Sequence, residues 1–256
     1  MMQLDSLSVG YTASANAVLC ALDLHVPAGG FVCLLGRNGA GKSTLLRTLA
    51  GLQSPLAGQV VVEGQAMQTM SSAERARRVA VVLTERQFGL GLTVEEVVAM
   101  GRQPHTGWRG RLNTDDWRLV NDAIAEAGAA ALVGRYLDDL SDGEKQRVMI
   151  ARAIAQAPQI MLLDEITAFL DLPGRVESML LLKRYAVQRG ATVVLSSHDL
   201  ELSLQLADTI WLLNGKGECL AGSPQDLQAS GVLGSVFDTD TVAYSSESKQ
   251  FLLLGK

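Results

Sequence analysis

Cysteine and histidine are scarce in this chain of 256 residues, which contains three of each. Cys20, Cys33 and Cys219 form no C-x-x-C pair, and neither the cysteines nor the histidines cluster in the sequence. A zinc site or a disulfide framework is therefore not expected, and a reducing compartment fits this cysteine usage.

Excess positive charge is also missing. The chain has 22 lysine and arginine residues against 27 aspartate and glutamate residues, for a net charge of −5. A nucleic-acid-binding domain needs a basic footprint, so we expect no nucleic acid partner. The small basic clusters at 75–78 and 109–111 are explained as solvated faces.

Long apolar runs are absent too. No stretch has the length that a membrane-spanning helix requires, and the first residues, Met1–Asp5, lack the basic and apolar regions of a signal peptide. We therefore expect no membrane span and no signal peptide, so that any membrane role depends on a partner.

The chain does contain enough apolar material for a large core, with 48% hydrophobic and 19% charged residues. Short apolar runs alternate with helical patterns, which predicts an α/β fold with a small antiparallel sheet and a parallel sheet covered on both faces. Strands are expected at 3–9, 22–26, 31–35, 59–63, 79–83, 160–164, 192–196 and 209–213. Helices are expected at 43–52, 93–101, 114–128, 141–156, 174–188 and 200–206, with a loop at 102–108.

A glycine-rich segment follows the strand at 31–35. It fits G-x-x-x-x-G-K-[ST], a pattern that forms a phosphate-binding loop when a strand precedes it and a helix follows. Lys42 is expected to reach the β- and γ-phosphates of a nucleotide, and Ser43 is expected to hold Mg²⁺. The candidate binding residues of this loop are Gly36, Arg37, Asn38, Gly39, Ala40, Gly41, Lys42, Ser43 and Thr44.

Two carboxylates end the strand at 160–164. Ligands in α/β folds bind at the carboxyl ends of parallel strands, so Asp164 is a candidate Mg²⁺ ligand. Glu165 is then placed to orient or deprotonate an attacking water. Core strands often end in acidic residues, and this assignment depends on the phosphate loop that accompanies it.

His198 follows the strand at 192–196, which should lie beside the strand of the phosphate loop. From there it could hydrogen-bond the terminal phosphate and polarise the water. A lone histidine after a strand is more often a cap or a loop residue, but the accompanying motifs favour the catalytic interpretation.

A second anion site is expected at 140–146. Ser141 and Glu144 form a capping box that starts a helix, and a capped helix N-terminus containing Gly143 also attracts anions. The chain already has one phosphate loop, far away in sequence. This helix end is therefore expected to serve the nucleotide of a second subunit.

Together these motifs resemble the ATP-binding subunit of an ATP-binding-cassette (ABC) transporter, up to about residue 222. The resemblance implies a single nucleotide-binding domain, 1–256, with a P-loop NTPase (RecA-like) core and a small antiparallel β subdomain. The core would comprise 1–85 and 159–222, the helical signature subdomain 86–158, and a C-terminal extension 223–256.

In that family two subunits enclose two ATP molecules. The resemblance implies that this chain hydrolyses ATP with Mg²⁺ as a homodimer, with Ser141 and Gly143 contacting the partner's ATP. It also implies that Asp171 couples the two sites and that Tyr11 stacks on adenine. Two transmembrane permease subunits and, indirectly, a substrate-binding protein would complete the transporter. The chain would then lie at the cytoplasmic face of the membrane as a peripheral subunit.

Three features depart from the family's pattern. Asp142 and Glu144 replace the usual Gly and Gln of the signature, and carboxylates near a phosphate weaken binding unless they point away or bond to backbone N–H groups. Ile166 replaces the usual Pro after the catalytic Glu. The Q-loop Gln is also missing from its expected place. The candidates for its role are Thr84, Glu85 and Gln87.

The segments 93–94, 101–104 and 109–112 resemble the importer branch that takes up iron chelates, haem and cobalamin. We expect an importer of an iron-siderophore or haem chelate first, and of cobalamin second. Two other classes stay open. One is a soluble ABC ATPase such as an iron–sulfur assembly factor. The other is a nucleotide-binding regulatory module that does not hydrolyse ATP. The presence of Lys42, Glu165 and His198 together argues against this class.

Overall fold

A six-stranded sheet lies at the centre of the protein. The computed structural model describes residues 1–11, 17–83, 91–107, 110–168 and 170–254. The strand order is β10-β9-β3-β8-β7-β6, and every pair is parallel except β9 with the edge strand β10. The strands are β3 (Phe31–Gly36), β6 (Val79–Val82), β7 (Ile160–Asp164), β8 (Thr192–Ser196), β9 (Thr209–Leu213) and β10 (Cys219–Gly222).

The three middle strands carry the residues predicted to bind phosphate. Every residue of β3, β7 and β8 is buried, which confirms the expectation of a parallel sheet covered on both faces. Strand β8 pairs with β3 on one side and with β7 on the other. The carboxyl ends of these strands therefore meet at one edge, and the register sets Asp164 directly beside Ser196.

A second sheet of four antiparallel strands, in the order β2-β1-β4-β5, packs beside the first, as the sequence predicts. Its strands are β1 (Met2–Gly10), β2 (Ala17–Val26), β4 (Ala57–Val62) and β5 (Gln65–Ala66). The prediction that the second strand starts at residue 22 was wrong, since β2 begins at Ala17. Residues 22–26 alternate strictly between buried and exposed, whereas 17–21 do not, because the pairing with β1 is irregular there and Ala21 has a φ of 47°.

Two apolar cores fill the two faces of the central sheet. Side chains alternate across β3: Val32 and Leu34 join the core beneath the antiparallel sheet, whereas Cys33 and Leu35 face the opposite core. The first core includes helix α1 (Lys42–Leu49), and the second includes α6 (Leu172–Arg189). The loop that ends β3 is thus held between two packed layers.

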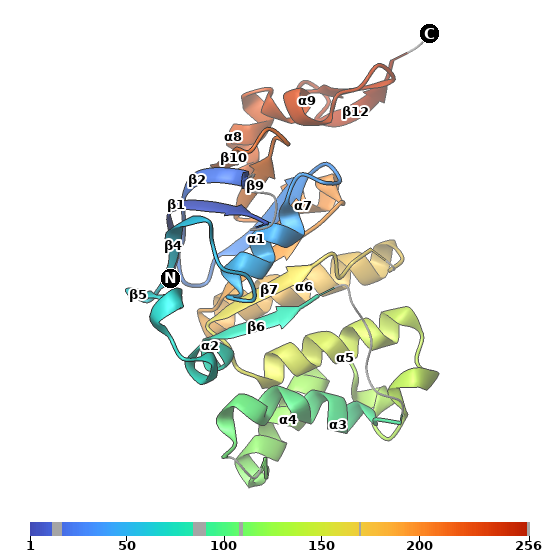
Figure 1. Ribbon diagram of the computed structural model, residues 1–256. Coiled ribbons are helices and arrows are strands. Elements are labelled where there is room, and N and C mark those ends of the chain that lie inside the picture. Colours follow the sequence, from blue (N-terminus) through green and yellow to red (C-terminus); the bar gives the residue numbers. More distant parts are fainter. Residues whose placement is uncertain (12–16, 84–90, 108–109, 169, 255–256) are drawn as a thin grey trace.

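Three helices form a separate layer at one end of the molecule (Figure 1). They are α3 (Val94–Ala99), α4 (Thr114–Glu126) and α5 (Asp142–Ala155), and each carries a capping box at its N-terminus. The predicted caps Thr93 and Ser141 are confirmed. Short helices before the C-terminal segment include α2 (Ser72–Arg78), α7 (Leu200–Leu206) and the 3₁₀ turns η1 (Met67–Thr69), η2 (Met100–His105), η3 (Ala130–Leu132) and η4 (Leu137–Asp139).

The predicted loop at 102–108 is partly helical. The turn η2 runs through Pro104 to His105. Arg102 explains why this segment is helical. Its side chain is buried, forms an ion pair of 3.0 Å with Asp116, and donates to the carbonyl oxygen of Ala155 at 2.9 Å. These partners lie in α4 and α5, so a tertiary contact decides the conformation of the segment.

The C-terminal segment extends from the end opposite the helical layer (Figure 1). It contains α8 (Pro224–Ala229), α9 (Val232–Phe237) and a hairpin of β11 (Val242–Ser245) with β12 (Gln250–Leu253). Phe251 packs against Phe237 and Tyr244, with ring centroids 6.1 and 5.1 Å apart. Within the described ranges, no helix of the chain is both long and apolar enough to cross a bilayer.

Candidate functional site

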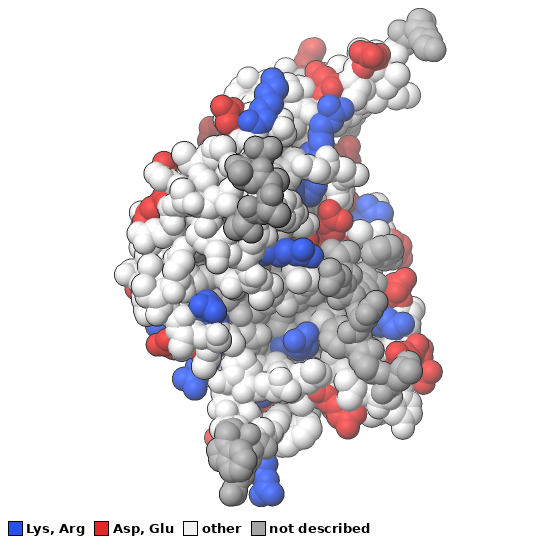
Figure 2. Space-filling model, in the orientation of Figure 1, with Lys and Arg blue, Asp and Glu red and all other residues white. Residues whose placement is uncertain are grey.

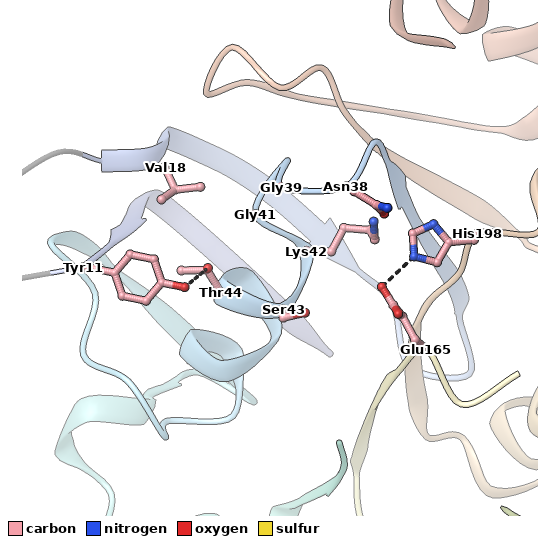
Figure 3. A pocket seen from close by; sticks show the side chains of 10 residues that line it. All are labelled: Tyr11, Val18, Asn38, Gly39, Gly41, Lys42, Ser43, Thr44, Glu165 and His198. Atoms are coloured by element: carbon pink, nitrogen blue, oxygen red, sulfur yellow. Dashed lines mark hydrogen bonds and ion pairs between the residues drawn. The ribbon is translucent and has the colours of Figure 1, made fainter. Parts of the chain in front are cut away.

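A pocket of about 640 Å³ opens at the carboxyl edge of the central sheet. Its walls come from the loop between β3 and α1, from β2, and from the segments that follow β7 and β8 (Figure 3). The residues that line it are Tyr11, Val18, Asn38, Gly39, Gly41, Lys42, Ser43, Thr44, Glu165 and His198. Nine of these ten were singled out as candidate site residues, and the structure brings them together.

Gly41 shapes the floor of the pocket. Its φ is 103°, and a Cβ at this position would lie 2.6 Å from Cγ1 of Val18. Only glycine fits this turn without a clash. Helix α1 starts at the next residue, and its first turn carries Lys42, Ser43 and Thr44 but no acidic side chain. The helix N-terminus therefore presents N–H groups and a positive dipole end to an anion.

Lys42 lies at the centre of the pocket and is only 5% exposed. Its Nζ donates to the carbonyl oxygens of Gly36 and Arg37 at 3.0 and 3.4 Å. Burial lowers the pKa of Lys42, and the nearby carboxylates of Glu165 and Asp164 oppose that change. The ammonium group is thus held by the loop itself, in a position from which phosphate oxygens can replace the two carbonyls.

The hydroxyl group of Ser196 forms hydrogen bonds with both Asp164 and Glu165. The Oγ atom of Ser196 donates to Oδ1 of Asp164 at 2.5 Å and accepts the backbone N–H of Glu165 at 3.0 Å. Ser196 is fully buried, and Glu165 has a φ of 51°. The chain therefore turns sharply after β7, and this turn sends Asp164 into the sheet edge and Glu165 into the pocket.

Glu165 and His198 meet across the pocket. Nε2 of His198 lies 2.7 Å from Oε1 of Glu165, and both side chains face Lys42 (Figure 3). An ionised carboxylate only accepts hydrogen bonds, so the histidine donates its Nε2–H and orients the carboxylate. The predicted bond of His198 to a phosphate stays a prediction, since Nε2 is engaged with Glu165 in this structure.

Tyr11 stands at the outer rim of the pocket. Its hydroxyl lies 3.2 Å from Oγ1 of Thr44, and the residue is 54% exposed. The bond fixes the ring beside the start of α1 (Figure 3). The stacking of Tyr11 on adenine stays a prediction, which this position beside the phosphate loop allows.

The predicted second anion site is a fully formed helix cap. Ser141 caps α5, its Oγ accepting the N–H of Glu144 at 3.3 Å and donating to Oε2 of Glu144 at 2.8 Å. The same carboxylate accepts the N–H of Ser141 at 2.8 Å and binds Nη1 of Arg135 at 2.9 Å. The backbone N–H and the hydroxyl of Ser141 hold the pKa of Glu144 below its usual value, and Arg135 adds to the effect. Glu144 thus bonds to a backbone N–H group, which is one of the two conditions under which a carboxylate near a phosphate is not expected to weaken binding.

Gly143 and Asp171 lie beside each other in the fold but outside the pocket. A Cβ on Gly143 would be 3.3 Å from Cδ2 of Leu170, so the first turn of α5 packs on the segment before Asp171. Asp171 caps α6 by accepting the N–H of Gly174 at 3.0 Å. Ser141, Gly143 and Asp171 are absent from the described lining of the pocket. The Q-loop candidates at 84, 85 and 87 lie outside the described residues.

Two residues of the site escaped the sequence analysis. Ser196 sits in an apolar strand, and only its pairing beside Asp164 reveals a role. Val18 lies on β2, and its contact with the Gly41 turn depends on how the two sheets pack. Neither residue carries a local pattern that could have identified it.

The described side chains at this edge of the sheet supply only some of the ligands that Mg²⁺ needs. Among the described residues, no group of three or more His, Cys, Asp or Glu side chains could hold a metal ion. Mg²⁺ commonly binds through one or two protein ligands together with substrate phosphates and water. Ser43 in the pocket wall and Asp164 at the strand end are suited to that kind of shared site.

Charged side chains are sparse over the middle of the face seen in Figure 2, where large areas are uncharged. Lysine and arginine side chains lie singly among acidic and uncharged ones on that face.

Comparison with known sequences identifies the family. A family model for ABC transporters matches residues 19–168. A petrobactin import ATP-binding protein of Bacillus anthracis is 35% identical over 243 residues, which span 95% of this chain and 89% of that relative. A cobalamin import ATP-binding protein of Halobacterium salinarum is 36% identical over 238 residues, which span 93% of this chain and 59% of that relative.

Solved structures give the same result. A metal-chelate type ABC transporter in an inward-facing conformation matches with a TM-score of 0.83 and 28% identity, covering 100% of this chain and 98% of that one. The cassette MJ0796, solved as a dimer in a post-hydrolysis state with ADP and Pi, matches with a TM-score of 0.75 and 26% identity, covering 88% and 99% of the two chains. This chain therefore belongs to the ABC transporter family, as an ATP-binding domain built on the P-loop NTPase fold.

Proposed function

We propose that this protein is the ATP-hydrolysing subunit of a membrane importer for iron chelates or haem. The observation that carries the proposal is the convergence of Lys42, Glu165 and His198 in one pocket at the end of a phosphate-binding loop. A module that only binds nucleotide has no need of a carboxylate held by a histidine beside the phosphate site. This arrangement therefore favours hydrolysis over a regulatory role.

Each residue has a defined task in this proposal. The loop from Gly36 to Thr44 and the N-terminus of α1 hold the phosphates, and Lys42 exchanges its carbonyl partners for phosphate oxygens. Glu165 accepts a proton from the attacking water, while His198 keeps its carboxylate oriented. Mg²⁺, held by Ser43 and Asp164, would neutralise charge that builds up on the phosphates.

The proposed active form is a homodimer with two shared ATP sites. Ser141, Gly143 and Asp171 do not line the pocket of their own chain, so a second copy is needed to bring them to the nucleotide. The dimeric cassette MJ0796 supports this arrangement. In the proposal, 86–158 forms the signature subdomain, 1–85 with 159–222 the core, and 223–256 a C-terminal extension.

We further propose that the dimer binds two transmembrane permease subunits at the cytoplasmic face of the membrane. A substrate-binding protein would act on the permeases rather than on this chain. The iron-chelate assignment is supported by the petrobactin import relative and by the metal-chelate type transporter. The cobalamin import relative supports cobalamin as the second candidate. A soluble cassette ATPase such as an iron–sulfur assembly factor would lack the permease.

Two experiments test the function. Lys42→Ala and Ser141→Ala chains should each be inactive alone, and mixing them should restore part of the ATPase activity, because mixed dimers contain one intact site. Full activity of either single variant would contradict the shared site. Purification of the tagged protein from detergent-solubilised membranes should yield permease subunits, and their absence would favour the soluble alternative.

A further inference from the structure

The signature segment of this protein is acidic where it should attract a nucleotide. Asp142 and Glu144 both stand in the first turn of α5, next to the capping residue Ser141. A helix N-terminus carries a partial positive charge of roughly half a unit, so one full negative charge at this place more than cancels its attraction for a phosphate. Some other group must offset that charge if a triphosphate is to bind here.

Arg135 is the group that the structure places against Glu144. Its Nη1 binds Oε1 of Glu144 at 2.9 Å, and its Nη2 donates to the carbonyl oxygen of Asp139 at 2.9 Å. The side chains are partly exposed, 43% for Arg135 and 28% for Glu144. The guanidinium therefore spans the turn before α5 and neutralises a carboxylate within it.

The backbone around Arg135 is anchored to another helix. The N–H of Val94 donates to the carbonyl oxygen of Arg135 at 3.0 Å, and Thr93 forms a β-bridge with Tyr136. Glu95 adds a second link by accepting the N–H of Gly134 at 2.9 Å. Arg135 is thus presented to the signature from a segment that is fastened to the start of α3.

The hydroxyl proton of Ser141 is donated to the carboxylate of Glu144. Ser141 Oγ donates to Oε2 of Glu144, while Oε1 binds Arg135. To donate to a phosphate, the hydroxyl must release Glu144, which then keeps the N–H of Ser141 and the guanidinium of Arg135 as partners. Without Arg135, the carboxylate loses a positive neighbour and faces the incoming phosphate with its full charge.

We propose that Arg135 is a positioning residue that makes Glu144 compatible with nucleotide binding at the signature, by neutralising this carboxylate and holding it back on the helix cap. The inference rests on the proposed function, in which Ser141 faces the ATP of the partner subunit. It predicts that Arg135 is needed only because residue 144 is a carboxylate.

A charge-rescue experiment tests this dependence. In the full-length Glu165→Gln chain, which is expected to trap the closed dimer, sedimentation velocity measures the ATP concentration that gives half-maximal dimer. Adding Arg135→Gln should raise that concentration about fivefold to tenfold, the effect of one exposed charge acting on a phosphate at short range. Adding Glu144→Gln as well should return it to within about twofold of the parent, because Gln keeps the capping box.

The control is Arg118→Gln, which removes an arginine from the exposed ion pair with Asp115 on α4 and should leave the concentration unchanged. The defect of Arg135→Gln should also shrink as salt is added, since screening weakens the repulsion. Thermal melting of each variant shows that it is folded.

Three results would separate the possible failures. If Arg135→Gln has no effect, Arg135 has no such role. If the double variant stays as weak as Arg135→Gln and the defect ignores salt, Arg135 acts only as a support for the turn at Asp139, and the charge proposal is overturned. If the Glu165→Gln parent stays monomeric at saturating ATP, the shared-site function fails, and this proposal fails with it.

Discussion

Removal of the Ser196 hydroxyl is the sharpest test of how the catalytic edge is built. Its Oγ is the only described side-chain atom that bonds both to Asp164 and to the backbone of Glu165. The Ser196→Ala variant removes both bonds and little volume. Because Ser196 is fully buried, water cannot replace them without rearrangement of the sheet edge.

The size of the effect follows from the two bonds. The bond to the Asp164 carboxylate is worth about 1.5–3 kcal/mol and the bond from the Glu165 N–H about 0.5–1.5 kcal/mol. Loss of both should lower the free energy of unfolding by about 2–4.5 kcal/mol, or Tm by about 4–18 °C in a chain of this size. If loss of the bond to Asp164 raises the free energy of the transition state by the full energy of that bond, kcat falls about 10- to 100-fold.

The matched control lies at the opposite end of the same strand. Thr192 is also fully buried, and its hydroxyl donates to the carbonyl oxygen of Pro27 at 3.1 Å. Thr192→Val removes that bond at nearly constant shape, so it should lower Tm but leave kcat within about twofold, because it acts on stability alone. Thermal melts and steady-state ATPase assays at saturating ATP measure the two quantities.

The two variants together distinguish an effect of the Ser196 hydroxyl from an effect of the whole strand. Glu165 keeps a second backbone bond, from its N–H to the carbonyl oxygen of Ser196 at 3.2 Å. If Ser196→Ala loses stability but keeps its full kcat, that backbone bond is enough to position the carboxylate. An equal drop of kcat in both variants would show that turnover depends on the strand as a whole rather than on this hydroxyl.

Three further changes test other parts of the site. Glu165→Gln should lower turnover about 10²- to 10⁴-fold, the usual loss of a general base, while still binding ATP; near-normal turnover in a steady-state assay would assign the role to another carboxylate. Lys42→Ala should abolish nucleotide binding in a fluorescence titration, and unchanged affinity would remove the phosphate-site assignment. Asp116→Asn should destabilise the helical layer by about 3–5 kcal/mol in denaturant titrations, because it leaves Arg102 buried without its charged partner. The N–H of Asn113, together with Arg102, holds the pKa of Asp116 below its ordinary value of 3.8, so this stabilisation is present above that pH and is lost as the pH falls through the lower folded-state value. If the free energy of unfolding of the wild-type protein does not change as the pH falls below 3.8, the stabilising role of ionised Asp116 is contradicted.

Local patterns in the sequence were sufficient for most of the elements that carry the site. The strand, loop and helix around Lys42 follow from an apolar run, glycines and a helical repeat that are adjacent in the chain. The caps at Thr93 and Ser141 follow from residue pairs three positions apart, and helix α7 has the predicted bounds of 200–206. Interactions of this range are completed within one or two helical turns, so the sequence alone specifies them.

Contacts between distant segments decided the rest. Ser196 became part of the site only because β8 pairs with β7 in a register that sets it beside Asp164. The turn at Met100–His105 became helical because Arg102 is buried against α4 and α5, and Glu144 gained a positive partner because the chain places Arg135 against it. Such interactions join residues through packing and strand register, which no single stretch of sequence contains. The sequence by itself therefore determined which chemistry the chain carries, and the tertiary structure determined which side chains hold that chemistry in place.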